Sequence, residues 1–202
     1  MLGDGCVAVH PEDERHQAYI GKTLRHPILG YEVPVVADAI LVDPEFGTGA
    51  VKVTPAHDFN DFETGKRHNL TLFNIFDVNA HILETPEVED PILSALDMDA
   101  WAEFAGLSRD DARKKVKAKL AELGLDRGSE DHVMALGVSE RTGAVVEPML
   151  SIQWFIDTKP LAEPALQAVK TGETRIIPEQ WTKTYYHWME NIQDWCISRQ
   201  LW

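Results

Sequence analysis

The chain has 202 residues, 44% of them hydrophobic and 26% charged, with 33 Asp and Glu against 19 Lys and Arg and a formal net charge of −14. This composition excludes a disordered chain. The excess of acidic residues also excludes a surface that grips nucleic acid mainly through its phosphates, because that mode of binding needs clustered Lys and Arg. Any RNA that binds should therefore touch only a small part of this chain.

The cellular compartment is indicated by the absence of a membrane-spanning run, a signal peptide and a disulfide framework from the sequence. No apolar run approaches the roughly 20 residues that cross a bilayer, and the opening "MLGDGCVAVHPEDER" does not have the order of a signal peptide. The two cysteines, Cys6 and Cys196, give neither a disulfide framework nor a metal-ligand spacing. We expect a soluble cytoplasmic protein with no membrane partner.

Residues 1–80 are predicted to be rich in β-strand. Short β-branched or aromatic runs bounded by Gly, Pro and Asp occur at residues 6–10, 34–43, 49–55 and 70–77. These runs predict a twisted sheet or a small barrel.

The stretch "GTGAVKVTPAHDFNDF", residues 47–62, combines a Gly-rich turn, an alternating strand and two carboxylates. Side chains alternate along a strand, so Lys52 and Thr54 should share one face. A proline then ends the strand, and a helix follows with Asp58 at its N-cap and Asp61 in its first turn. Two interpretations stay open. The aspartates stabilise the positive end of the helix, or all four side chains form a polar pocket for a small ligand with an ammonium and a hydroxyl.

Residues 83–100 hold prolines among acidic residues, which predicts a surface excursion. Residues 108–123 predict a helix, with Ser108 as N-cap, Asp111 as its capping-box partner and Gly124 at the end. The apolar stripe of this helix should comprise Ala112, Val116, Leu120 and Leu123.

The composition shifts near residue 150, where we place a boundary. A strand region is predicted at 139–156, followed by helices at 160–172 and 182–195. The last helix should carry an aromatic stripe of Tyr185, Trp188, Ile192 and Trp195. The sequence ends at Trp202 without a turn, cap or polar tail, which indicates that it leads into a further domain.

Two motifs resemble those of valyl-tRNA synthetases. "GTGAVKVTPAHDFNDFETGKRHNL", residues 47–70, is similar to the core motif of their editing domain, and "MENIQDWCISRQLW", residues 189–202, is similar to the return into their catalytic domain. Between these two motifs, "EPMLSIQWF", "PLAEPAL" and "IIPEQWTKTY" resemble the same family in the same order, so the resemblance covers nearly the whole chain. Isoleucyl relatives share "GTG" and "DWCISRQ", but they usually carry His at Lys52, Gly at Asp58 and Arg-Pro at Ile192-Gln193.

The resemblance implies an α/β fold: a β-barrel-like editing domain of class I aminoacyl-tRNA synthetases with peripheral helices. Residues 1–150 would be the editing domain without its Thr-rich N-terminal peptide, and residues 151–202 a connecting segment that leads back to the Rossmann-type core. The implied activity is hydrolysis of threonine wrongly esterified to valine tRNA, within an enzyme that attaches valine with ATP. An isoleucyl-type domain that clears valine, or a segment that folds without independent activity, are the alternatives.

Carried over residue by residue, the resemblance gives Asp61 the catalytic role of holding the α-ammonium of the substrate or orienting it for attack. Lys52, Thr54 and Asp58 would recognise the threonine hydroxyl, and Phe46 would pack against the terminal adenosine of the tRNA. Taken from the residues alone, Phe46 is a hydrophobic residue at a strand start.

The resemblance also bears on cofactors and partners. Ser139 and Thr142 stand where some members have a Cys-x-x-Cys zinc knuckle, so no metal is expected. No cofactor is expected in this chain, because ATP and Mg²⁺ belong to the catalytic domain, whose His-Ile-Gly-His and Lys-Met-Ser-Lys-Ser signatures do not occur here. The expected partners are the mischarged CCA end of valine tRNA and the remainder of the synthetase, with the protein a monomer.

Overall fold

The computed structural model describes residues 1–89, 91–129, 133 and 135–199 of the chain. The chain forms two compact units, Met1–Leu150 and Ser151–Trp202. The assignment of these units to an editing domain and a connecting segment stays a prediction.

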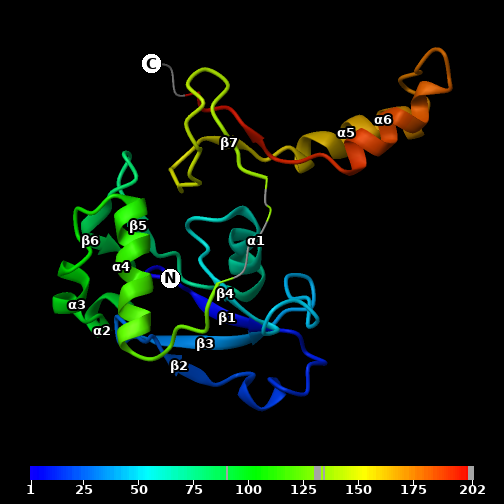
Figure 1. The fold of residues 1–202 in the computed structure, drawn as a ribbon. Helices are drawn as coiled ribbons and strands as arrows, with labels where there is room; N and C mark the ends of the chain where they lie inside the picture. The colour runs from blue at the N-terminus through cyan, green and yellow to red at the C-terminus, as the bar shows by residue number, and fades with distance from the viewer. Residues whose placement is uncertain (90, 130–132, 134, 200–202) are drawn as a thin grey trace. The chain divides into compact units, whose positions relative to one another are not determined.

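The elements of the first unit (Figure 1) are, in chain order, β1 (Cys6–Val9), a short 3-10 helix η1 (Gln17–Tyr19), β2 (Thr23–Arg25), β3 (Glu32–Ala37), β4 (Ala50–Val53), α1 (Phe59–His68), β5 (Asn74–Phe76), β6 (Ile82–Glu87), α2 (Ile92–Ala95), α3 (Met98–Ala102) and α4 (Arg109–Glu122). The second unit contains β7 (Phe155–Ile156), α5 (Lys159–Lys170), α6 (Trp181–Glu190) and β8 (Trp195–Cys196). Within the described residues, no helix combines the length and apolar character needed to span a bilayer.

A four-stranded sheet in the order β2-β3-β1-β4 organises the first unit. β1 pairs in parallel with β3 and antiparallel with β4, so that Val7 lies opposite Val35 on one side and Lys52 on the other. β5 and β6 form a separate antiparallel pair. A closed barrel would need the two edge strands of one sheet to pair with each other. In the described residues β2 and β4 remain opposite edges of an open sheet, so the barrel-like expectation is wrong.

The strand predicted at 34–43 ends early because Asp38 turns the chain. Its Oδ1 accepts the N–H groups of Ile40 and Leu41 at 2.9 and 2.8 Å, and its Oδ2 lies 2.7 Å from Arg67 and 2.9 Å from His68. Burial alone would raise the pKa of Asp38, but these donors outweigh it and hold the pKa at about 2. The ion pairs thereby attach the end of α1 to the end of β3.

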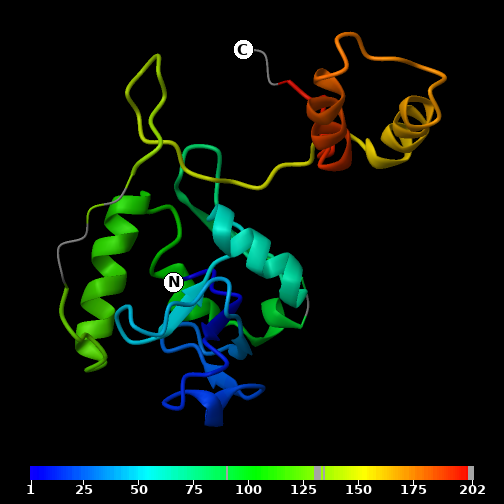
Figure 2. The same cartoon turned by 90° about the vertical axis from the view of Figure 1, so that its right-hand side faces the viewer.

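The sheet separates two apolar clusters. Successive side chains of β1 alternate between them, with Cys6 and Ala8 in the smaller cluster and Val7 packed against the larger one. The larger cluster is closed by Trp101 and Phe104, which are fully buried, and by the apolar side of α4. Figures 1 and 2 show α4 and α1 apart in both views, with the N-terminal segment between them.

Residues 83–100 are not a surface excursion, so this expectation is wrong. They contain most of β6, all of α2 and the start of α3, and Leu96 is buried in the larger cluster. The indole N–H of Trp101 donates to the carbonyls of Leu83 and Glu84 and holds α3 against β6. Pro86 is compatible with β6 because a strand paired on one side only leaves its other edge unbonded.

The helix predicted at 108–123 is confirmed as α4. Ser108 is its N-cap, accepting the N–H of Asp111 at 3.2 Å and donating to the Asp111 carboxylate at 2.9 Å. Ala112 belongs to the larger cluster, whereas Leu123 is 47% exposed and does not. Val116 and Leu120 complete the packed stripe.

The second unit departs from prediction at its end. The helix predicted at 160–172 is confirmed as α5, but α6 ends at Glu190, so Ile192 and Trp195 are not part of a helical stripe. Trp195 lies in β8 and pairs with Ile156 of β7. In the region predicted as strand, the described structure has one isolated bridge, Val138 to Val145, before β7. Trp202 lies outside the described residues.

We predict that Gly65→Ala destabilises the protein, although alanine favours a helix by about 1 kcal/mol over glycine. A Cβ at Gly65 would lie 2.9 Å from the Cβ of Pro55, which is fully buried and rigid, and such overpacking costs about 1 to 3 kcal/mol. Urea unfolding should show a net loss of up to about 2 kcal/mol. Gly137→Ala is the control, because a Cβ there meets nothing closer than 4.0 Å. Equal or greater stability of the Gly65 variant would contradict the packing argument.

Candidate functional site

The candidate site lies where β4 ends and α1 begins. The backbone N–H of Thr54 donates to Oδ2 of Asp61 at 2.7 Å, across the turn between the two elements. Asp58 is the N-cap of α1, and its Oδ1 accepts the N–H groups of Asn60 and Asp61 at 2.9 and 3.0 Å. The helix-cap interpretation is therefore confirmed for Asp58, whereas Asp61 faces the strand.

Lys52 and Thr54 share one face of β4, as strand alternation predicts. Nζ of Lys52 donates to Oγ1 of Thr54 at 2.9 Å and lies 3.9 Å from Oδ2 of Asp61. Oγ1 of Thr54 donates in turn to Oδ1 of Asp4 at 2.8 Å. One polar cluster thus contains Lys52, Thr54, Asp61 and Asp4.

Asp4 is the member of this cluster that sequence reasoning missed. Its side chain is buried, and it reaches Thr54 because Gly3 and Gly5 let the N-terminal segment approach closely. A Cβ at Gly3 would lie 2.8 Å from the carbonyl oxygen of Phe73, and a Cβ at Gly5 would lie 3.1 Å from the ring of Pro55. The sequence signal was the Gly-Asp-Gly triplet at residues 3–5, which places a carboxylate between two residues without side chains.

Opposing electrostatic effects act on the carboxyl of Asp61. It is 7% exposed, and burial raises the pKa of its carboxyl above the ordinary value, while the N–H of Thr54 and the charge of Lys52 act in the opposite direction. Oδ1 of Asp61 accepts no hydrogen bond from the residues that the structure describes. The carboxyl of Asp61 is therefore held in place through one oxygen, and its other oxygen is available to a cationic ligand.

Two other reactive groups lie near the corner. Burial raises the pKa of the Cys6 thiol to about 12, so this cysteine is not a thiolate nucleophile. The ring of His57 accepts the N–H of Ile75 at Nε2 and donates from Nδ1 to the carbonyl of Pro148, and burial lowers its pKa. His57 is therefore a neutral residue with both nitrogens bonded.

The remaining candidate, Phe46, lies apart from this cluster along the chain. It belongs to the loop of residues 43–49 that leads into β4, whereas the cluster lies at the end of that strand, and 68% of its surface is exposed. The structure therefore does not make Phe46 the core residue that its position at a strand start suggested.

The cluster borders a hollow and contains no obvious metal site. Lys52 lines a hollow of about 560 Å³ whose walls include Ile75, Phe76 and residues of α4, with no Asp or Glu among its described lining residues. Across the described part of the chain, no group of three or more His, Cys, Asp or Glu is arranged to hold a metal ion.

Comparison with known proteins places the chain in a family. The family model described as "tRNA synthetases class I (I, L, M and V)" matches residues 14–202. The chain belongs to the class I tRNA synthetases. Over all 202 residues it is 54% identical to a valine--tRNA ligase of Geobacter sulfurreducens, 52% to one of Thermotoga maritima and 50% to one of Syntrophotalea carbinolica. The chain covers 21 to 22% of the length of these relatives.

These comparisons confirm the resemblance to the valyl enzymes of class I, whose similarity extends over the whole chain. They do not distinguish the roles of single residues, so the functions of Lys52, Thr54, Asp58, Asp61 and Phe46 stay predictions.

We predict that Asp61→Asn leaves the protein as stable as wild type at neutral pH, or more stable. Because the pKa of Asp61 is raised in the folded state, its contribution to stability is fully present below the ordinary carboxyl pKa and is lost as pH rises through the raised value. Asparagine removes that cost and keeps an oxygen for the N–H of Thr54. The variant also loses the ion pair with Lys52, but this should change the free energy of unfolding little, because that lysine is half exposed.

Urea unfolding of both proteins between pH 3 and 8 tests this prediction. The difference in free energy of unfolding should shrink as pH falls below the ordinary carboxyl pKa. A variant that is less stable only at neutral pH would show that the ionised carboxylate stabilises the fold.

Proposed function

We propose that the first unit hydrolyses threonine wrongly esterified to valine tRNA, as the editing part of a longer enzyme that attaches valine to tRNA with ATP. The observation that carries this proposal is the carboxylate of Asp61, buried beside Lys52 with one oxygen bonded to the backbone and the other available. Membership of the class I synthetases and the whole-length similarity to valine--tRNA ligases support it.

In this proposal Asp61 binds the substrate through charge. An aminoacyl ester carries an α-ammonium, and Oδ1 of Asp61 accepts a charge-assisted hydrogen bond from it. The partly buried site strengthens that bond relative to water, and the incoming cation favours the ionised form of a carboxyl whose pKa burial has raised. The ester carbonyl is thereby fixed beside the cluster.

Lys52 and Thr54 supply selectivity for the hydroxyl of threonine. Oγ1 of Thr54 is already bonded to Lys52 and Asp4, so Thr54 acts mainly by fixing these two side chains. The ammonium of Lys52 has three donors and uses one on Thr54, which leaves donors for the substrate hydroxyl. Asp58 lies one turn before Asp61 on the same corner, and its carboxylate adds negative potential there while capping α1.

Hydrolysis then needs a positioned water. The water attacks the ester carbonyl carbon, the bond to the ribose oxygen breaks, and threonine and the free tRNA hydroxyl leave. With Cys6 buried as a thiol and His57 bonded at both nitrogens, the water is oriented by backbone groups or by the neighbouring ribose hydroxyl of the substrate. The reaction calls for no bound cofactor. ATP and Mg²⁺ serve valine activation elsewhere in the longer protein.

Selective hydrolysis matters because a pocket shaped for valine rejects the isosteric threonine poorly. Only the aminoacyl end of the tRNA contacts this unit, and the rest of the tRNA contacts other parts of a monomeric enzyme. That division agrees with the net charge of −14.

We predict that Asp61→Asn in the full-length enzyme abolishes hydrolysis of threonyl-tRNA and leaves valine activation unchanged. The asparagine keeps the bond to the N–H of Thr54 but cannot pair with an ammonium. Rates of deacylation and of ATP–pyrophosphate exchange measure the two activities separately. Glu63→Gln is the matched control, because Glu63 is an exposed residue of α1 whose carboxylate pairs with Lys66. Hydrolysis at the wild-type rate in the Asp61 variant would contradict the catalytic role proposed for Asp61.

We predict that Lys52→Met narrows the preference for threonyl-tRNA over valyl-tRNA by roughly 10- to 150-fold, the equivalent of one hydrogen bond to a charged group, about 1.5 to 3 kcal/mol. Valine has a methyl group in place of the hydroxyl, so in wild type it leaves the lysine unpaired. The measurement is the ratio of the two deacylation rates. An unchanged ratio would remove Lys52 from substrate recognition.

A further inference from the structure

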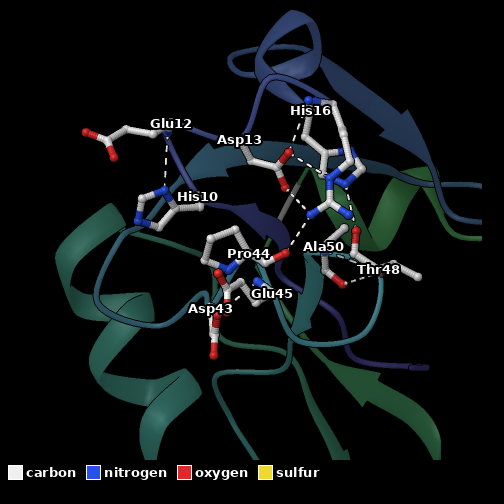
Figure 3. Close-up of polar contacts among 10 residues, drawn as sticks. His10, Glu12, Asp13, His16, Asp43, Pro44, Glu45, Thr48 and Ala50 are labelled. Carbon is white, nitrogen blue, oxygen red and sulfur yellow. Dashed lines mark hydrogen bonds and ion pairs between the residues drawn. The ribbon is translucent and has the colours of Figure 1, made fainter.

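The loop of residues 43–49, which carries Phe46, is held by a cluster that lies outside the β4–α1 corner. Arg15 and Asp13 form a bidentate pair, with Nε 2.8 Å from Oδ1 and Nη2 2.6 Å from Oδ2. The same Nη2 donates to the carbonyl of Pro44 at 2.6 Å, which attaches the pair to the loop. In Figure 3 dashed lines mark these contacts at Asp13 and Pro44.

A second attachment lies at the other end of the loop. Nε2 of His16 is 2.9 Å from the carbonyl oxygen of Thr48, so residues 15 and 16 contact the loop before and after Phe46 (Figure 3). Asp13 is itself fixed, because its carboxylate accepts the N–H of Arg15 and its carbonyl accepts the N–H groups of His16 and Gln17. The two attachments therefore start from one well-ordered turn.

The shape of the loop is matched to this ion pair. Gly49 has a φ of +73°, and a Cβ there would lie 2.5 Å from Nη2 of Arg15 and 2.7 Å from Oδ2 of Asp13. Its N–H donates to the carbonyl of Phe46 at 3.1 Å, and the N–H of Phe46 donates to Asp43 at 3.2 Å. Only a glycine lets the loop fold back on itself while lying against the guanidinium.

We propose that Asp13 and Arg15 are positioning residues that hold Phe46 as a preformed platform for the terminal nucleoside of the RNA. This inference rests on the proposed function, and it assigns a role to residues that do not touch the reacting ester. An exposed aromatic ring binds a base best when its backbone is already ordered, because ordering a loop on binding costs conformational entropy. The Arg15 guanidinium removes that cost before the substrate arrives.

The planar fork of the guanidinium is essential to this role. It satisfies the carboxylate of Asp13 and the carbonyl of Pro44 at the same time, whereas a lysine ammonium has no matching fork. Arg15→Lys should therefore rescue the function only in part.

A double-mutant cycle in the full-length enzyme tests the proposal, with threonyl-tRNA as substrate. Arg15→Ala should raise KM for deacylation several-fold with kcat nearly unchanged, and Phe46→Ala should do the same. Since Arg15 acts through Phe46, the double variant should be no worse than Phe46→Ala alone. Arg25→Ala is the control, because among the described residues its exposed guanidinium hydrogen-bonds just the carbonyl of Gly30, and its kinetics should match wild type. Additive effects of Arg15 and Phe46 would overturn the proposal.

Hydrogen–deuterium exchange provides a readout that does not depend on activity. In Arg15→Ala the amides of residues 43–49 should exchange faster than in wild type, while those of α4 keep their protection. Unchanged exchange in the loop would overturn the positioning role even if deacylation were impaired. If the wild-type enzyme did not hydrolyse threonyl-tRNA, the proposed function would fail, and the exchange result would still decide whether Arg15 orders the Phe46 loop.

Discussion

The hydrogen bond from the backbone of Thr54 to Asp61 is the constraint on which the first unit depends. It joins the residue that directly follows β4 to the first turn of α1, so the direction of the helix is set by the edge strand of the sheet. A Cβ at Gly5 or Gly65 would lie 3.1 or 2.9 Å from Pro55, so both glycines let their segments pack closely against this turn. The side-chain hydroxyl of Thr54 donates to the carboxylate of Asp4, which attaches the N-terminal segment to the same turn. The N-terminal segment, β4 and α1 therefore meet at Thr54.

Burial of the Asp61 carboxyl at this turn costs free energy, and it also leaves the carboxyl able to bind a ligand. A carboxylate surrounded by protein loses hydration, and its pKa rises, unless donors compensate. Asp38 and Asp61 are both buried, yet their pKa values move in opposite directions. Asp38 is bonded by two N–H groups, Arg67 and His68, and it stabilises the fold. Asp61 has one N–H and a more distant lysine, so part of its bonding capacity is left for a ligand.

Local patterns in the sequence predicted local structure well. Strand alternation placed Lys52 and Thr54 on one face, and capping rules identified Asp58 and Ser108, because these features depend on near neighbours. The early end of β3, the open sheet and the burial of Leu96 depend on contacts distant in sequence, such as those of Asp38 with Arg67 and of Trp101 with β6. Asp4 was missed for the same reason, since fifty positions separate it from Thr54.

The two parts of the proposed substrate site, the corner around Asp61 and the loop that carries Phe46, are held by different contacts. The difference agrees with the function proposed for each part. The corner around Asp61 is fixed by a hydrogen bond from the main chain of Thr54 to the Asp61 carboxylate, and Gly5 and Gly65 pack so closely against Pro55 that an added Cβ at either would crowd it. The Phe46 loop is fixed by the side chains of Arg15 and His16, which can be replaced one at a time without disturbing the sheet. Placing the ester relative to a water demands the first kind of support, because small displacements there alter reaction rate. Under the proposed function, holding a base against an aromatic ring tolerates the second kind of support, so replacing Arg15 or His16 would alter affinity for the RNA end and leave the arrangement around Asp61 unchanged.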